Sequence, residues 1–244
     1  MRFLIQKIDR EVRHDFSFTL LESRRYQNWL QQDKNAITVK YVNCYANDNV
    51  WFFKPFHQHY VPVGSVEFVL SWMKRFGVPT PSPMNVPEEL MIPSCVKRPI
   101  LNGTHEDLNG NGKWFVKSND KIKGISGFFN ENEYDFPEGN YQISDYIPIL
   151  SEWRVFVYQG KMVGLQNYSG DFTIFPTVSE IKYMISKFKS APVAYTLDVG
   201  KNEYDTFVIE CHDFFSCGLY GFADHKIYPY MLYRWFHEYL NKNK

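Results

Sequence analysis

The sequence predicts an α+β fold, with a small α/β unit in the first half and mainly antiparallel strands in the second. Strand, helix and strand patterns follow one another within the first 80 residues. From residue 113 onward, short strand patterns come in quick succession, without the strand–helix alternation that accompanies a parallel sheet. A proline-rich segment separates the two halves. These three observations define the fold class and its division.

In the first half, apolar patterns predict strands at 1–9 and 37–45 and a helix at 15–32. The apolar face of that helix is expected to consist of Phe18, Leu21, Tyr26, Trp29 and Leu30. A turn at 46–49 should lead into a returning strand at 50–53. A second helix is predicted over 65–76, where Ser65 caps its start and Gly77 ends it.

The two halves are joined by residues 79–93, which contain five prolines. Proline lacks the backbone N–H that a helix or a central strand needs, so this segment is expected to be an extended connector. The sequence therefore predicts one domain over residues 1–95, with the connector at its end, and a second domain over residues 96–244.

The second half is expected to begin with a polar, turn-rich segment at 102–113 and to end with an amphipathic helix at 228–242. Another helix is predicted at 179–190, with Ser179 as its cap. The predicted strands lie at 113–118, 141–147, 153–159, 161–168, 194–200 and 206–211.

Charge, apolar runs and cysteine content bear on the class of partner and on the location of the protein. Lys and Arg together number 27, as do Asp and Glu, so the basic excess typical of a nucleic-acid partner is missing and none is expected. No apolar run reaches the length of a membrane span, and no membrane association is expected. The four cysteines form no CxxC pair, which is consistent with free thiols and a cytoplasmic location.

Acidic side chains lie between apolar neighbours on the last two predicted strands. Residues two apart on a strand share a face, so Thr196 shares a face with Asp198, and Glu210 shares one with His212. If the strands are neighbours, Asp198, Glu210 and His212 converge. A divalent cation would relieve the repulsion between the two carboxylates. The alternative, that the acids pair with Lys or Arg across the sheet, is equally consistent with the pattern.

Cationic residues on other predicted strands suit phosphate binding. Lys117 ends an apolar strand, and the loop that follows it contains Lys121, Lys123 and two glycines. A solvated hairpin is the simpler explanation of that loop. Arg154 also lies among apolar strand neighbours, where a guanidinium can make bidentate contact with a phosphate or carboxylate. A salt bridge to Glu152, on the same face, would equally explain Arg154.

Taken in order, these segments resemble the ATP-grasp superfamily. The order is a strand lysine (WFVKS), a Gly/Lys loop (KIKGISG), ISDYI, an acid-x-Arg strand (SEWRVFV), LDVG and VIECHD. Together with VPVGSVEF, VPEEL and GLYG, they resemble a phage- and bacteria-associated clade named for one Arg and two Lys. The resemblance covers most of the chain, and residues 1–95 match the small pre-ATP-grasp domain. It implies two lobes with antiparallel sheets that hold ATP between them.

The resemblance also implies roles for individual residues. Lys117 and the loop lysine Lys123 would contact phosphates, as would Lys97, for which Arg98 is a rival. Arg154 would stabilise the transferring phosphoryl group or the acyl phosphate, so Lys117 and Arg154 are the expected catalytic residues. The hinge against adenine is expected to be formed by Asp145, Tyr146 and Ile147. The expected metal ligands are Asp198, Glu210 and His212.

The sequence departs from the family pattern at His212, where asparagine is usual. Imidazole is a softer ligand than an amide oxygen and prefers transition metals. The cofactors implied are therefore ATP and Mg²⁺, with Mn²⁺ possible, and Asp213 is a substitute ligand.

The function implied is that of an ATP-dependent carboxylate–amine ligase, which forms an amide through an acyl phosphate. Its substrates would be a small-molecule or peptide carboxylate and an amine. A kinase or another phosphotransferase on the same fold is the first alternative. A non-catalytic nucleotide-binding protein is the second, because fold alone does not determine function. The sequence does not specify an oligomeric state.

Overall fold

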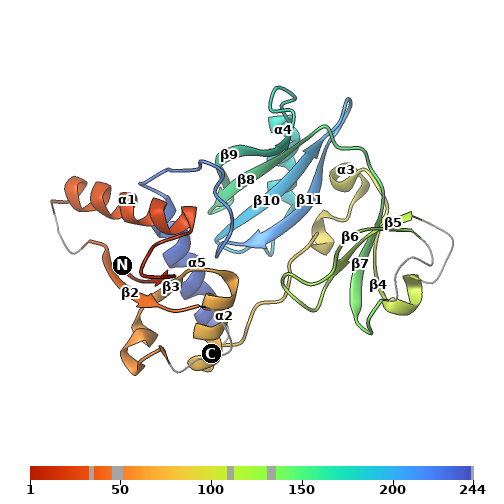
Figure 1. Cartoon of the computed structure of the whole chain (residues 1–244). Coiled ribbons are helices and arrows are strands. Elements are labelled where there is room, and N and C mark those ends of the chain that lie inside the picture. The colour runs from red at the N-terminus through yellow and green to blue at the C-terminus, as the bar shows by residue number, and fades with distance from the viewer. Residues whose placement is uncertain (33–35, 46–51, 109–112, 131–135, 243–244) are drawn as a thin grey trace. The chain divides into compact units, whose positions relative to one another are not determined.

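The chain forms two compact units, which are described separately. The computed structural model describes residues 1–32, 36–45, 52–108, 113–130 and 136–242 (Figure 1). Unit 1 comprises Met1–Thr80, Pro192–Tyr195 and Asp213–Lys244, and unit 2 comprises Pro81–Ala191 and Thr196–His212. Residues 81–95 thus group with unit 2, and residues 213–244 group with unit 1. The domain boundary between residues 95 and 96 stays a prediction.

Unit 1 contains a three-stranded sheet of order β2-β1-β3, in which β1 is parallel to both neighbours. The central strand contains Phe3, Leu4 and Ile5 in succession, all fully buried. Such a continuous apolar run is expected for a strand covered on both faces. The strands of this sheet are β1 (Arg2–Lys7), β2 (Thr38–Asn43) and β3 (Val61–Val63).

The helices of unit 1 are α1 (Asp15–Leu30), α2 (Val66–Arg75), the short 3-10 helix η2 (Pro55–His59) and α5 (Tyr228–Lys242). The Ser65 hydroxyl accepts a hydrogen bond from the Phe68 backbone N–H at 3.2 Å, so the predicted cap of α2 is correct. Trp72 of α2 is buried, and its ring lies 5.1 Å from that of Phe236 on α5. Unit 1 therefore joins helices from both ends of the sequence.

The predicted apolar face of α1 is wrong. Phe18, Trp29 and Leu30 are 52%, 73% and 51% exposed, and the side chains buried instead are those of Phe16, Ser17, Leu20, Ser23 and Gln27. Ser23 and Gln27 occupy this face because they have hydrogen-bond partners within unit 1. The Gln27 side-chain amide donates to the carbonyl oxygens of His225 and Lys226 at 2.9 and 3.2 Å. These hydrogen bonds offset the cost of burying the amide.

Unit 2 contains an antiparallel sheet of order β4-β7-β5-β6. Its strands are β4 (Ile100–Thr104), β5 (Lys113–Ser118), β6 (Ser126–Asn130) and β7 (Asn140–Asp145). Val116, Tyr141 and Ile143 form its buried core. The loop expected after Lys117 is shorter than predicted, because Ser126–Asn130 pairs with β5 as a strand.

A second sheet, of order β11-β10-β8-β9, contains Arg154 and the three residues expected to bind metal (Figure 1). Its strands are β8 (Ser151–Tyr158), β9 (Lys161–Gly170), β10 (Ala194–Lys201) and β11 (Thr206–Asp213). Helix α4 (Val178–Lys187) begins earlier than predicted, and Thr177 rather than Ser179 occupies the N-cap position. Ser179 therefore lies inside the first turn of the helix. The last pair of strands is placed as the sequence predicts.

The proline-rich segment is extended and hydrogen-bonds to both sheets of unit 2. The Val86 backbone exchanges two 3.0 Å hydrogen bonds with the Gln142 side-chain amide on β7. Nearby, the Asn85 carbonyl accepts a 2.6 Å hydrogen bond from the Cys211 N–H on β11. The segment then continues into η3 (Glu88–Leu90) and α3 (Pro93–Val96), and η4 (His105–Leu108) follows β4. The predicted connector is thus an integral part of unit 2.

Two local predictions fail or lie outside the described residues. Phe52 and Phe53 do not form part of the strand predicted for 50–53, and residues 50 and 51 are outside the described chain. The turn predicted at 46–49 is also outside it. In the part of the chain that the structure describes, no helix combines the length and apolar character needed to cross a membrane.

Candidate active site

Arg154 and Asp198 form a buried pair on neighbouring strands of the second sheet. Arg154 on β8 is 7% exposed and Asp198 on β10 is 1% exposed. The guanidinium donates from Nε to Oδ1 at 2.8 Å and from Nη2 to Oδ2 at 2.7 Å. This bidentate geometry fixes both side chains and neutralises both charges. The pair with Asp198, rather than the predicted salt bridge to Glu152, is the main reason why an arginine can be buried at position 154.

Glu152 is hydrogen-bonded to Tyr168. The Tyr168 hydroxyl on β9 donates to Glu152 Oε2 at 2.7 Å, and the Arg154 guanidinium carbon lies 5.6 Å from the centroid of the Tyr168 ring. Burial raises the pKa of Tyr168, and the negative charges of Asp198 and Glu152 raise it further. Tyr168 thus remains a neutral hydrogen-bond donor beside Arg154. Sequence reasoning missed it, although its position opposite the acid-x-Arg strand was the available signal.

Lys117 connects the two sheets of unit 2. It lies on β5, and its ammonium group forms an ion pair with Glu210 Oε2 on β11. Both side chains are only 16% exposed. Burial lowers the pKa of Lys117 to about 8, while the negative charge of Asp198 opposes that shift. A desolvated ammonium group in this position can contact a phosphate oxygen as a point charge.

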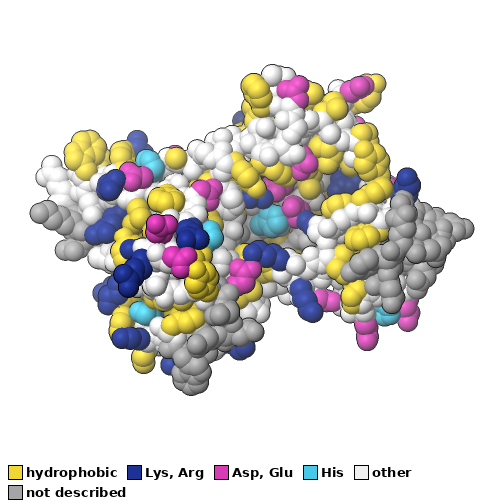
Figure 2. All heavy atoms as spheres, viewed as in Figure 1, with side chains coloured by type: hydrophobic (Ala, Val, Ile, Leu, Met, Phe, Trp, Pro, Cys, Tyr) yellow, Lys and Arg dark blue, Asp and Glu magenta, His cyan; other side chains and the backbone are white. Residues whose placement is uncertain are grey.

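His212 completes the group of residues predicted to bind metal. Its Nε2 atom lies 3.1 Å from Glu210 Oε1 and 3.8 Å from Asp198 Oδ2. One ligand atom from each of the three residues lies within 4.8 Å of the other two. Figure 2 shows acidic, basic and histidine side chains gathered where Figure 1 draws β11.

The donor set fits a divalent cation in number and type, with two carboxylates and one imidazole. Two basic side chains compete with a cation for these carboxylates, because Arg154 contacts Asp198 and Lys117 contacts Glu210. The alternative in which the acids pair with basic residues across the sheet is therefore also realised in this structure. A cation would have to displace these contacts.

The predicted hinge residues border a cavity of about 290 Å³ within unit 2. Asp145 ends β7, and Tyr146 and Ile147 follow it. The other lining residues come from both sheets and the segments beside them, and are Arg98, Phe115, Phe128, Ser144, Ile149 and Ile209. The cavity is thus a mainly apolar space with a few polar groups, which suits a flat heterocycle.

Arg98 is part of the wall of this cavity. Its Nη1 atom donates to the carbonyl oxygens of Val96 and Val208, both at 3.0 Å. Burial lowers the pKa of Arg98 to about 10. The guanidinium is therefore held by backbone oxygens of β11 and of the segment before β4.

Lys97 contacts other acidic groups. Its ammonium lies 3.5 Å from Glu180 Oε1 and 3.3 Å from Asp205 Oδ1. Lys123 is exposed in the loop between β5 and β6, with a φ of 58°. Asp213, considered as a substitute metal ligand, accepts a 2.8 Å hydrogen bond from the Trp235 indole. The structure therefore brings together Lys117, Arg154 and the predicted metal triad, but gives Lys97 separate partners.

The fold and these side chains together define an ATP-grasp protein. The family model described as ATP-grasp domain, R2K clade family 2, matches residues 96–229, more than half of the chain. The chain belongs to this family. No curated protein matches it.

Several solved structures resemble most or nearly all of this chain. The D-alanine–D-alanine ligase from Bacillus anthracis is similar with a TM-score of 0.57 at 11% identity, covering 99% of each chain. A RimK domain ATP-grasp protein from Sphaerobacter thermophilus has a TM-score of 0.54 at 11% identity, over 99% of this chain and 100% of that one. N5-carboxyaminoimidazole synthetase from Staphylococcus aureus has a TM-score of 0.52 at 11% identity, over 87% and 71%. The α+β ATP-grasp fold is confirmed.

Proposed function

We propose that this chain is an ATP-dependent carboxylate–amine ligase that forms an amide or peptide bond. The observation that carries the proposal is the convergence in unit 2 of Lys117, Arg154, Asp198, Glu210 and His212. The strands β5 and β11 supply residues both to this cluster and to the cavity lined by the hinge. The ligases among the similar structures, one of them described with bound ATP, support the same reaction class.

In the proposed reaction, the γ-phosphoryl group of ATP is transferred to a substrate carboxylate, and an amine then displaces phosphate from the acyl phosphate. Lys117 and Arg154 neutralise the charge on the phosphoryl oxygens, which is the main protein contribution to phosphoryl transfer. Asp198, Glu210 and His212 would hold Mg²⁺, which when bound supplies further positive charge at the phosphates. Tyr168 keeps Arg154 in place through ring contact.

The adenine base is proposed to occupy the cavity beside Asp145, Tyr146 and Ile147. Lys97 and Lys123 stay proposed phosphate contacts, and Lys97 would have to reorient to make its contact. For Lys97 the reorientation would break ion pairs with Glu180 and Asp205, which are partly exposed and therefore weak.

Nucleotide binding is tested by thermal unfolding with Mg·ATP, since a ligand that binds the native state raises its stability. We expect the midpoint of the wild-type protein to rise, and the rise to be lost in Glu210→Gln. The matched control is Glu203→Gln, which changes an exposed glutamate in the turn between β10 and β11. Equal stabilisation of the wild-type protein and Glu210→Gln would refute the assigned site.

The reaction itself is tested by mass spectrometry of products after incubation with ATP and mixtures of carboxylates and amines. ADP together with a new amide supports the ligase, whereas a stable phosphate ester would identify a kinase. A non-catalytic nucleotide-binding protein is the second candidate, because Asp198 and Glu210 are already paired with cationic side chains. Stabilisation by ATP without any ADP release would favour that candidate.

A further inference from the structure

Strand β2 of unit 1 forms one edge of its sheet. Within a parallel ladder, the N–H and C=O of one residue point to the same side. The N–H groups of Thr38 and Cys44 donate to the carbonyl oxygens of Met1 and Lys7 at 2.9 Å. The backbone groups of the even-numbered residues of β2 therefore point toward β1. Val39, Tyr41 and Asn43 must then direct their backbone groups outward. Among the described residues, nothing hydrogen-bonds to these outward groups.

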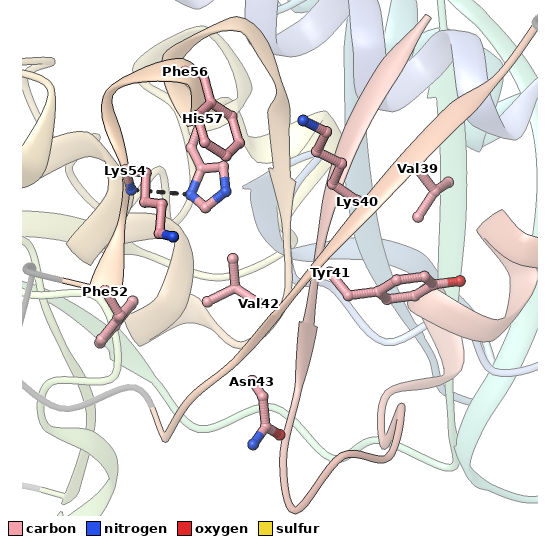
Figure 3. A pocket seen from close by; sticks show the side chains of 9 residues that line it. All are labelled: Val39, Lys40, Tyr41, Val42, Asn43, Phe52, Lys54, Phe56 and His57. Carbon is pink, nitrogen blue, oxygen red and sulfur yellow. Dashed lines mark hydrogen bonds between the residues drawn. The ribbon is translucent and has the colours of Figure 1, made fainter.

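A groove with a volume of about 620 Å³ runs along this edge, between β2 and the segment 52–57. Figure 3 shows the side chains of Lys54, His57 and Val42 turned toward the same space, and those of Val39 and Tyr41 turned away from it. The groove therefore combines an open strand edge with a face on which side chains of a ligand can be recognised.

The groove is cationic. None of its nine lining residues is acidic, while Lys40 and Lys54 carry positive charge. The Lys40 ammonium lies 4.2 Å from the centroid of the Phe56 ring and 5.2 Å from that of Tyr60, so it is held at the groove. Burial lowers the pKa of His57, and the positive charges of Lys40 and Lys54 lower it further. Figure 2 shows basic side chains gathered over the part of unit 1 in which Figure 1 draws β2.

We propose that the edge of β2 is a docking site for an extended peptide segment with carboxylates at alternate positions. Its backbone would add a strand beside Val39, Tyr41 and Asn43. Alternate side chains of a strand share a face, so its carboxylates would meet Lys40 and Lys54. The charge disfavours a second copy of this chain at the same edge, because pairing two β2 strands would bring like charges together. This binding is independent of the proposed ligase reaction.

The charge requirement is tested by fluorescence anisotropy with the full chain and a fluorescein-labelled peptide of alternating glutamate and valine. We expect saturable binding to the wild-type protein that weakens by about tenfold or more in the double variant Lys40→Glu/Lys54→Glu. The matched control, Lys74→Glu/Lys226→Glu, changes two exposed lysines of unit 1 away from the groove and should bind like the wild-type protein. Equal binding by both double variants would overturn the proposal.

The backbone requirement is tested with the same peptide methylated at every peptide nitrogen, which keeps the charges but removes the hydrogen-bond donors. We expect its binding to be lost. Tyr41→Pro removes one outward N–H while leaving the hydrogen bonds to β1 intact, as proline at an edge allows, and should weaken binding of the unmethylated peptide. If this variant does not fold, the methylated peptide still decides. Undiminished binding of the methylated peptide would refute the proposal. So would a dimer in sedimentation of the wild-type protein that Tyr41→Pro abolishes.

Discussion

Both carboxylate oxygens of Asp198 accept hydrogen bonds from Arg154. Asp198 could therefore bind a metal ion only if that ion replaced the guanidinium. Exchanging the guanidinium for a cation would free Arg154 to contact the transferring phosphoryl group. The same exchange applies to Lys117 and Glu210. At the residue scale, the two cationic side chains proposed for catalysis are therefore each paired with one of the two carboxylates proposed to bind metal.

Removing one member of the buried pair should be costly. Asp198→Asn leaves the Arg154 charge without its counter-charge, and we expect the free energy of unfolding to fall by about 3–5 kcal/mol. The double variant Arg154→Met/Asp198→Leu should lose less, because no uncompensated charge remains buried. Urea unfolding of the three proteins measures both effects. A double variant less stable than Asp198→Asn would contradict this view of the pair.

His212 should determine which metal supports nucleotide binding. In His212→Asn an amide oxygen replaces the imidazole nitrogen. Oxygen is the harder ligand and suits Mg²⁺, whereas the nitrogen favours Mn²⁺ over Mg²⁺. We expect the thermal stabilisation by Mg·ATP to increase relative to that by Mn·ATP. Unchanged relative stabilisation in the variant would show that His212 does not contact the metal.

ATP binding should weaken above pH 8. The folded-state pKa of Lys117 is lowered to about 8, so its ammonium group loses its proton as the pH rises through that value. If only the charged form binds phosphate, affinity should fall about fivefold between pH 8 and pH 9. Lys117→Arg keeps its charge in this range and should show a flatter profile. Titration of ATP at each pH makes the comparison, and parallel profiles would contradict the prediction.

Part of this site follows from the sequence alone. Strand alternation places Glu210 beside His212, and the apolar neighbours of Lys117 and Arg154 predict their burial. The pairing of Arg154 with Asp198 does not follow, because it depends on β8 lying next to β10, two strands that are separated by β9 and α4 in the sequence. The partner of Glu152 was missed although Tyr168 lies on β9, which directly follows β8 in the sequence and pairs with it.

At the scale of elements, α1 shows why apolar periodicity can mislead. Gln27 and Ser23 are buried because backbone and side-chain groups near His225 hydrogen-bond to them. No local pattern reports such a distant partner. The short strands β3, β4 and β6 were missed for a related reason, since each is defined by pairing rather than by its own few residues.

The orientation of α1 can be tested by two substitutions. Gln27→Leu leaves the carbonyl oxygens of His225 and Lys226 without these donors, and we expect it to reduce the free energy of unfolding by about 1–3 kcal/mol. Trp29→Ala, at a side chain that is 73% exposed, should change it by about 0.5 kcal/mol or less. Urea unfolding decides, and a larger loss in Trp29→Ala would restore the predicted face.

At the scale of the molecule, unit 1 is built from the first and last segments of the chain. The Tyr228 hydroxyl donates to the Phe16 carbonyl at 2.7 Å, and the Ser216 hydroxyl donates to the Gly64 carbonyl at 2.8 Å. Proline content predicted a division after the first half, but no feature of the sequence indicates that the last segment returns to the first.

Truncation after His212 should therefore unfold the first segment. Without α5, the buried aromatic side chains of α2 and β1 lose their cover, and we expect Met1–Thr80 to become sensitive to protease. Limited proteolysis followed by mass spectrometry locates the cleavages. The full-length chain is the control, and continued resistance of residues 1–80 would show that they fold alone.

This arrangement has a consequence for biosynthesis. The residues of unit 2 leave the ribosome almost as one run, whereas those of unit 1 are divided between the beginning and the end of translation. If the first eighty residues do not fold alone, they must wait with apolar surface exposed until Asp213–Lys244 has been made. A chaperone that binds nascent chains would have its main opportunity during that interval.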